Sequence, residues 1–175
     1  MKFLKTYNRT LINYDLLNKF SYKSINKLPK IKCIIINLSL KKNDLKLLIT
    51  YLAALKLITK QKGSVTLAKK SNIILKVRKG TPIGCKLTLR KNKMFELYLK
   101  LINKEMLTLN KVIIKQKKMF SFQIKDIFKF EELEYNYQFF NSLKLLNVNI
   151  NTKSDCKNQN KFLLSSFKII TSLHL

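Results

Sequence analysis

Histidine, cysteine and tryptophan, which carry much of the specialised chemistry of proteins, are rare in this sequence or missing from it. Tryptophan is absent, and the one histidine is His174. The three cysteines, Cys33, Cys85 and Cys156, are odd in number and far apart, which disfavours a disulfide framework and favours reduced surroundings. A single histidine offers no metal-ligand set at a recognisable spacing. The sequence therefore predicts no metal, no cofactor and no enzyme.

Acidic residues are the next scarcity. Nine Asp and Glu face 36 Lys and Arg, and the net charge is +27. Such an excess repels itself, and a polyanion relieves the repulsion, so nucleic acid is the expected partner. An ordinary basic protein and a protein of anionic membrane surfaces are the alternatives. Four of the nine acids, Asp126, Glu131, Glu132 and Glu134, crowd one stretch without a histidine or nucleophile, which favours a solvated acidic loop over paired catalytic carboxylates.

Arginine is scarce as well. Only Arg9, Arg78 and Arg90 occur, and the other 33 cations are lysines. Plentiful Asn, Ile, Phe and Tyr with only three glycines point in the same direction, since all these biases follow A/T-rich codons. We therefore expect an A/T-rich genome. A small organellar genome fits this bias, and a few nuclear and bacterial genomes would fit it too. The N-terminus shows neither a long apolar signal core nor an Arg- and Ser-rich transit segment, so synthesis inside the organelle is expected.

The periodicity of apolar residues predicts one α+β domain over residues 1–175, with residues 1–14 and 169–175 as flexible or chain-specific tails. The expected sheet is mostly antiparallel, with four to five strands. The apolar stretch 47–55 is far shorter than the roughly 20 residues of a membrane span, so no membrane insertion is expected. Tyr135, Phe139 and Phe140 are expected in the core. The expected helices are one or two within residues 1–28, then 44–58, 94–102 and 158–167, and the expected strands are 31–38, 85–90, 120–124 and 146–150.

One predicted strand carries the functional signal. After a turn or bulge at Pro82 and Gly84, residues 85–90 alternate between apolar and polar side chains. Cys85, Leu87 and Leu89 would face the core, while Lys86, Thr88 and Arg90 would form a cationic, hydroxylated face. The ordinary alternative is a solvated outer face. The overall charge and the cations just upstream favour RNA contact.

The same region resembles a known family. Residues 76–90 run KVRKGTPIGCKLTLR and are followed by Met94, Phe95 and Glu96. This closely resembles the signature of large-subunit ribosomal protein five of the bacterial type, approximately G-x-P-I-G-x-K-V-T-L-R-G-x-x-M-[YWF]-E-F. The resemblance extends over about residues 15–168. Further similar stretches, in family order, are 20–30, 34–37, 61–71 and 151–155.

The resemblance implies an antiparallel sheet with helices on one side and a place in the central protuberance of the large ribosomal subunit. It implies 5S rRNA, large-subunit rRNA, P-site tRNA and neighbouring ribosomal proteins as partners. The RNA-binding residues expected from the resemblance and the cationic face together are Lys23, Ser24, Asn26, Lys30, Lys32, Asn37, Gln61, Lys86, Thr88 and Arg90. The expected tRNA-facing loop, about residues 69–78, carries Lys69, Lys70, Ser71, Lys76 and Arg78.

Three departures from the family pattern stand out. The glycine-rich continuation after the first strand is replaced by Leu38-Ser39-Leu40, and the long loop before the strand at 120–124 is cut to about residues 111–118. The F-P-E-I element lacks its proline at residues 130–133. Such reduction favours a mitochondrial ribosome in the matrix over a plastid one. A free RNA chaperone or RNA-processing factor that uses the same basic face is the functional alternative.

Overall fold

The computed structural model describes residues 6–40, 44–74, 76–103, 113–116, 119–143, 145–154 and 156–167. These residues belong to two compact units, each assembled from separate segments of the chain. Unit 1 comprises residues 1–34, 89–123 and 149–175, and unit 2 comprises residues 35–88 and 124–148. The strands β1, β3, β5 and β6 contribute residues to both units.

Six strands are hydrogen-bonded in the order β2-β3-β1-β6-β5-β4 within the described residues. Their bounds are β1 Lys30–Ser39, β2 Ser64–Leu67, β3 Pro82–Leu89, β4 Ile113–Gln116, β5 Met119–Ile124 and β6 Leu146–Lys153. The pairs β2–β3 and β4–β5 are antiparallel. The predicted α+β class with an antiparallel sheet is confirmed, and the short edge strands β2 and β4 flank the four strands whose residues the sequence predicted.

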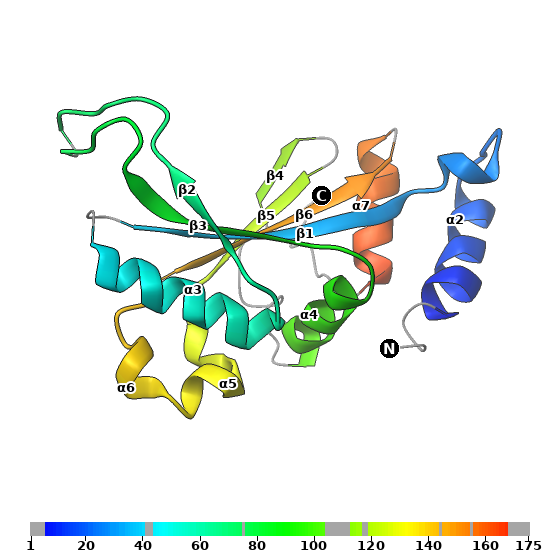
Figure 1. Cartoon of the computed structure of the whole chain (residues 1–175). Coiled ribbons are helices and arrows are strands. Elements are labelled where there is room, and N and C mark those ends of the chain that lie inside the picture. Colours follow the sequence, from blue (N-terminus) through cyan, green and yellow to red (C-terminus); the bar gives the residue numbers. More distant parts are fainter. Residues whose placement is uncertain are drawn as a thin grey trace. The chain divides into compact units, whose positions relative to one another are not determined.

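In unit 2 the helix α3 (Leu45–Thr59) covers the apolar side of β3. The Cys85 thiol of β3 donates to the Leu48 carbonyl of α3 at 3.8 Å, and both residues are buried. On α3 pack α5 (Glu131–Glu134) and α6 (Tyr137–Phe140), which follow the short helix η3 (Ile127–Lys129) (Figure 1). This unit therefore has its helices on one side of its strands, as predicted.

Unit 1 holds the helices near both chain ends and the helix that follows β3. They are η1 (Asn8–Ile12), α2 (Asn13–Lys19), η2 (Ile25–Lys27), α4 (Lys91–Asn103) and α7 (Lys157–Ser166). The helix α2 packs on α7, with the Phe20 and Phe162 rings edge to face and the Lys19 ammonium 4.4 Å from the Phe162 ring centre. The Tyr98 hydroxyl donates to the Phe167 carbonyl, and burial raises the pKa of Tyr98.

The segment around residues 111–118 is more than a shortened loop. Residues 113–116 form β4, in which Ile113 pairs with Ser121 and Ile114 pairs with Phe120 of β5. The consecutive β-branched residues Ile113 and Ile114 favour a strand, and β5 pairs with them. The prediction of a loop is wrong for these four residues, and the rest of 104–118 lies outside the described residues.

The acidic stretch and the aromatic residues after it also differ from expectation. Glu131–Glu134 forms the helix α5 rather than a loop, because Phe130 and Leu133 are buried and anchor it. Phe140 is buried as predicted. Tyr135 and Phe139 are 86% and 71% exposed, so the prediction that they belong to the core is wrong. Phe139 precedes the buried Phe140 in the four-residue helix α6, which can bury only one side of itself, and Tyr135 lies in the turn between α5 and α6.

The predicted tails are only partly described. Residues 8–19 are helical, and Ile12 and Leu16 are fully buried. The apolar side chains at these two positions, four residues apart, give the segment a face that packs inward. The C-terminal tail at 169–175 lies outside the described residues.

The buried thiol of Cys85 makes the stability of the protein depend on pH. Burial raises the pKa of the Cys85 thiol from 9.0 to about 11, whereas an unfolded chain ionises it near its ordinary value. As the pH rises from about 9 to 11, the unfolded chain loses this proton first. The thiol's contribution to stability is therefore complete below pH 9 and is lost towards pH 11.

We expect the free energy of unfolding, measured by urea titration, to fall from pH 8 to pH 10.5 more steeply for the wild type than for Cys85→Ala. Parallel pH profiles for the two proteins would contradict this expectation.

Alkylation of the native protein should modify the exposed Cys156 well before the buried Cys33 and Cys85.

Candidate nucleic-acid interface

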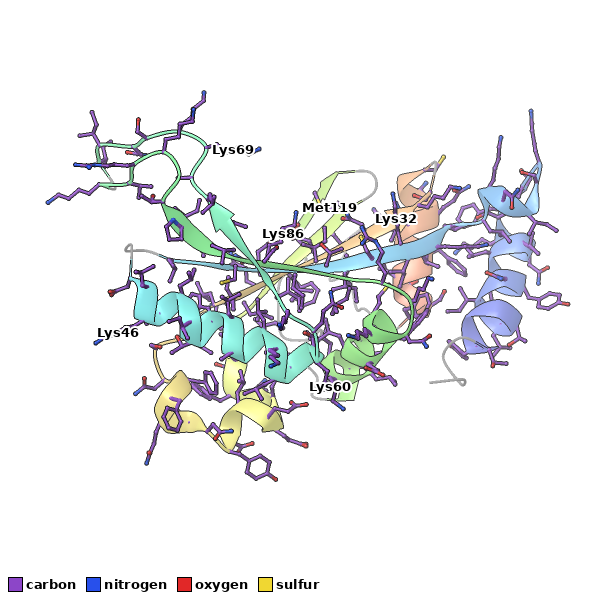
Figure 2. All side chains as sticks on the ribbon, in the orientation of Figure 1. Lys32, Lys46, Lys60, Lys69, Lys86 and Met119 are labelled. Atoms are coloured by element: carbon purple, nitrogen blue, oxygen red, sulfur yellow. The ribbon has the colours of Figure 1, made fainter. Side chains whose placement is uncertain are left out.

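The two faces of β3 differ in chemistry as the sequence predicts. In unit 2, Cys85 and Leu87 are buried towards the core, Lys86 is exposed and Thr88 is half-buried. Successive side chains of a strand point to opposite faces, so Lys86 and Thr88 share the face turned away from α3. Figure 2 shows Lys86 at β3 on the side opposite α3.

The strand β2 extends this polar face, and sequence reasoning missed it. Ser64 lies opposite Lys86 and Thr66 lies opposite Gly84, so both hydroxyl side chains share the face of Lys86. The Ser64 hydroxyl donates to the Lys86 carbonyl at 3.0 Å. The alternation Ser-Val-Thr-Leu was the available signal, but four residues are too few to separate a strand from a loop. The predicted bulge is present, because the β2–β3 register shifts beside Ile83.

Asn37 and Gln61 complete the face within unit 2. Asn37 is half-buried and alternates with the buried Ile36 and Leu38 of β1, the strand next to β3. Gln61 follows α3, and its side-chain amide donates to the Thr88 carbonyl at 3.3 Å. The structure thereby joins two predicted residues that lie 27 positions apart. We call this surface the open face: Asn37, Gln61, Ser64, Thr66, Lys86 and Thr88.

The hairpin that joins β2 to β3 carries the predicted tRNA-facing residues. Its base is closed by the Ala68 N–H donating to the Thr81 carbonyl and the Gly80 N–H donating to the Ala68 carbonyl, both at 2.9 Å. A bridge between Asn72 and Val77 narrows it further. All five predicted side chains are exposed on it: Lys69, Lys70, Ser71, Lys76 and Arg78.

Charge is distributed unevenly over these elements. The sequence contains no Asp or Glu between Asp44 and Glu96, a stretch that includes all of β2, the hairpin and β3. The cations there have no acidic neighbour along the chain to compete with an external anion. The open face and the hairpin are therefore suited to a polyanion.

The remaining predicted residues lie in unit 1, and all of them are exposed. They occupy the turn around η2, the first residues of β1 and the position just after β3: Lys23, Ser24, Asn26, Lys30, Lys32 and Arg90. Figure 2 shows Lys32 projecting from β1. For Asn149 and Asn151 of β6, the sequence predicts a strand but no part in binding. Both are half-buried and alternate with the buried Ile150, so this strand too has an amide-bearing face.

Two other kinds of site find no support in the part of the chain that the structure describes. Its His, Cys, Asp and Glu side chains form no group of three that could hold a metal ion. Its helices include none with both the length and the apolar character needed to cross a bilayer.

A sheet with a buried apolar face and an open face of lysine, hydroxyl and amide groups defines a basic α+β protein with a surface suited to a polyanion. Comparison with known proteins identifies the family. Residues 82–170 match the model that describes the C-terminus of the ribosomal L5 family. The chain is 38% identical over 180 residues to large ribosomal subunit protein uL5m of Reclinomonas americana, with 97% of each chain covered.

Two bacterial relatives agree. Large ribosomal subunit protein uL5 of Nitrosomonas europaea is 32% identical over 173 residues, covering 94% of this chain and 96% of its own. The uL5 protein of Clostridium acetobutylicum is 48% identical over 90 residues, half of each chain. This chain belongs to the L5 family of large-subunit ribosomal proteins, and its role is structural rather than enzymatic.

Proposed function

We propose that this chain is a structural constituent of the mitochondrial large ribosomal subunit, where it binds 5S rRNA in the central protuberance. The observation that carries the proposal is the open face, on which Lys86 lies among half-buried Asn37 and Thr88 with no acid in the surrounding sequence. The similarity to uL5m over nearly the whole chain supports the mitochondrial assignment. We further propose that the protein is encoded by the organelle and works in the matrix.

The open face suits folded RNA for a geometric reason. Double-stranded RNA presents a wide, shallow minor groove with 2′-hydroxyls and phosphates at its edges. A lysine such as Lys86 neutralises a phosphate and fixes position, while amide and hydroxyl groups can donate to and accept from 2′-hydroxyls and base edges. Gln61 keeps its side-chain carbonyl available for such a contact, because its amide donates to Thr88.

The other basic segments are assigned to further RNA contacts. The hairpin with Lys69, Lys70, Lys76 and Arg78 is proposed to reach towards P-site tRNA. The hydrogen bonds at its base and the bridge between Asn72 and Val77 further out give it the form of an arm that can extend from the sheet. The exposed residues of η2 and early β1 are proposed to contact 5S rRNA from the N-terminal side.

The assignment of the open face is tested by alanine substitution and filter binding to 5S rRNA at fixed salt. We expect Asn37→Ala and Thr88→Ala each to weaken binding about 5- to 10-fold, the value of one hydrogen bond to the RNA. Lys153→Ala, at an exposed end of β6, should change binding less than either. Equal or reversed losses would remove Asn37 and Thr88 from the interface.

Sedimentation of organelle extract separates the ribosomal role from that of a free RNA chaperone or processing factor. The chain should travel with the large subunit and remain there at salt concentrations that strip loosely bound proteins. A peak that is free of ribosomes would exclude the structural role proposed for it.

A further inference from the structure

Three lysines have backbone conformations that normally belong to glycine. Among the described residues, every non-glycine residue with a positive φ is a lysine: Lys60 at 54°, Lys76 at 52° and Lys91 at 52°. In this left-handed region the Cβ of an L-residue crowds the following carbonyl oxygen, whereas glycine has no Cβ and avoids the clash. Each of the three lysines therefore strains the folded chain relative to glycine at the same position.

Codon bias alone does not account for lysine at these positions. The A/T-rich bias that depletes glycine supplies asparagine as readily as lysine, and asparagine is plentiful in this chain. Asparagine, with aspartate, is also the residue other than glycine that tolerates the left-handed region best. A chain under selection for stability alone would have glycine or asparagine here. The lysine ammonium is therefore expected to have a use that offsets the strain.

Two of the three lysines are accounted for on other grounds. Lys76 is exposed on the hairpin that is proposed to reach tRNA. Lys60, at the end of α3 (Figure 2), has an interaction within the chain. Lys91 is different, because its side chain is exposed and no hydrogen bond or ion pair joins it to another residue that the structure describes.

Packing on both sides fixes the conformation of Lys91. Leu89 at the end of β3 and Met94 in α4 are both buried, and only four residues separate them. The chain turns from strand to helix within this distance (Figure 1), and the left-handed Lys91 lies in the turn. Since Leu89 and Met94 anchor the two sides, the backbone cannot move to relieve the strain.

The residues around Lys91 indicate the kind of partner. Arg90, Lys91, Asn92 and Lys93 are consecutive and exposed, and the nearest acid along the chain is Glu96. No large apolar side chain lies among these four, so the anchors by which proteins and lipid bilayers are bound are missing from the turn. Cations with an amide between them suit the phosphates and sugars of an RNA backbone.

We propose that Lys91 is a further phosphate contact with 5S rRNA, and that the chain loses stability at this position in order to hold a cation next to Arg90. The inference rests on the proposed RNA-binding function, in which Arg90 is already a contact. Lys91 would be a positioning residue, because a lysine neutralises a phosphate without reading a base. Its backbone strain destabilises the free protein, while its cation stabilises the complex.

Three substitutions at Lys91 separate the strain from the charge. Lys91→Gly removes both, Lys91→Ala removes only the charge, and Lys91→Arg keeps both. We expect Lys91→Gly to raise the midpoint of urea denaturation by about 0.3 to 0.5 M, the effect of relieving one left-handed residue, while the other two variants stay within about 0.1 M of the wild type. An unchanged midpoint for Lys91→Gly would overturn the proposal, since there would be no strain to offset.

Filter binding to 5S rRNA over a series of salt concentrations gives the second readout. Lys91→Gly and Lys91→Ala should each weaken binding about fivefold at low salt and make the salt dependence shallower by about one contact. Lys91→Arg should bind like the wild type. The matched control is Lys46→Gln, which removes one exposed charge on α3 and should lose less than about twofold.

The two readouts together decide the role of Lys91. A more stable Lys91→Gly protein that binds as tightly as the wild type would overturn the proposal, because the lysine would then have no use. An equal loss for Lys46→Gln, or weak binding by Lys91→Arg, would overturn it as well, since neither fits a phosphate contact at this one position. If Thr88→Ala also leaves binding unchanged, the 5S rRNA function itself fails; if Thr88→Ala weakens binding and Lys91→Gly does not, only the role of Lys91 fails.

Discussion

Replacing Gly84 by alanine is expected to lower the free energy of unfolding by about 3 kcal/mol, the upper range for forcing an extra methyl group into a packed site. A Cβ at this position would lie 2.3 Å from the Leu38 carbonyl oxygen and 3.2 Å from the Ser39 Cα. Both atoms belong to the backbone of β1, so no side chain can rotate away. The two strands would have to move apart, and the hydrogen bond that the Leu40 N–H donates to the Ile83 carbonyl at 2.9 Å would be weakened with them.

Urea denaturation of Gly84→Ala followed by circular dichroism measures this loss as a lower midpoint. The matched control is Gly63→Ala, because the nearest atom to its new Cβ is the end of the Leu55 side chain at 3.2 Å, which can shift. We expect the control to lose less than about 1 kcal/mol. Equal midpoints for the two variants would show that β1 and β3 tolerate separation at Gly84.

Reversing the charge of Lys86 is expected to weaken 5S rRNA binding by about 2 to 3 kcal/mol, or about 30- to 150-fold at low salt. The substitution Lys86→Glu removes one phosphate contact and places a carboxylate in the middle of the open face. Because each neutralised phosphate releases bound counterions, the dependence of the binding constant on salt should also become shallower by about one contact. Filter binding over a series of salt concentrations measures both effects.

Lys46→Glu is the control for this experiment. Lys46 is exposed on α3 in the same unit, and its replacement alters the net charge by the same amount. If binding depended only on overall charge, the two variants would lose affinity equally, and the open face would have no special role. A loss confined to Lys86→Glu would show that position on the surface matters.

The strands and helices that sequence analysis identified have long, regular patterns. The isoleucine-rich run at 31–38 became β1, the apolar stretch after Asp44 became α3, and the alternation at 146–150 became β6. The four-residue strands β2 and β4 escaped prediction, because each is defined by its partner strand rather than by its own sequence. Gln61 and Thr88 were expected separately, but only the fold could show that one donates to the other.

The exposure of Tyr135 and Phe139 could not have been predicted from residue type. Phe139 has the same side chain as the buried Phe130 and Phe140, and nothing in the order of residues along the chain marks it or Tyr135 as exposed. Exposure depends on which side of α3 remains uncovered after η3, α5 and α6 have packed on it. The sequence predicts a solvated loop for the acidic residues Glu131, Glu132 and Glu134. Their order along the chain does not show that the buried Phe130 and Leu133 anchor this stretch as a helix.

The separation of charges within unit 2 has a consequence for the rate at which the protein finds RNA. Its carboxylates lie with the helices, while β2, the hairpin and β3 carry cations and no acid. Such a unit has an electric dipole, and the field of a polyanion exerts a torque on a dipole before any atoms touch. The protein would thus reach an RNA surface already turned with its strands forward, so that a larger fraction of diffusional collisions becomes productive.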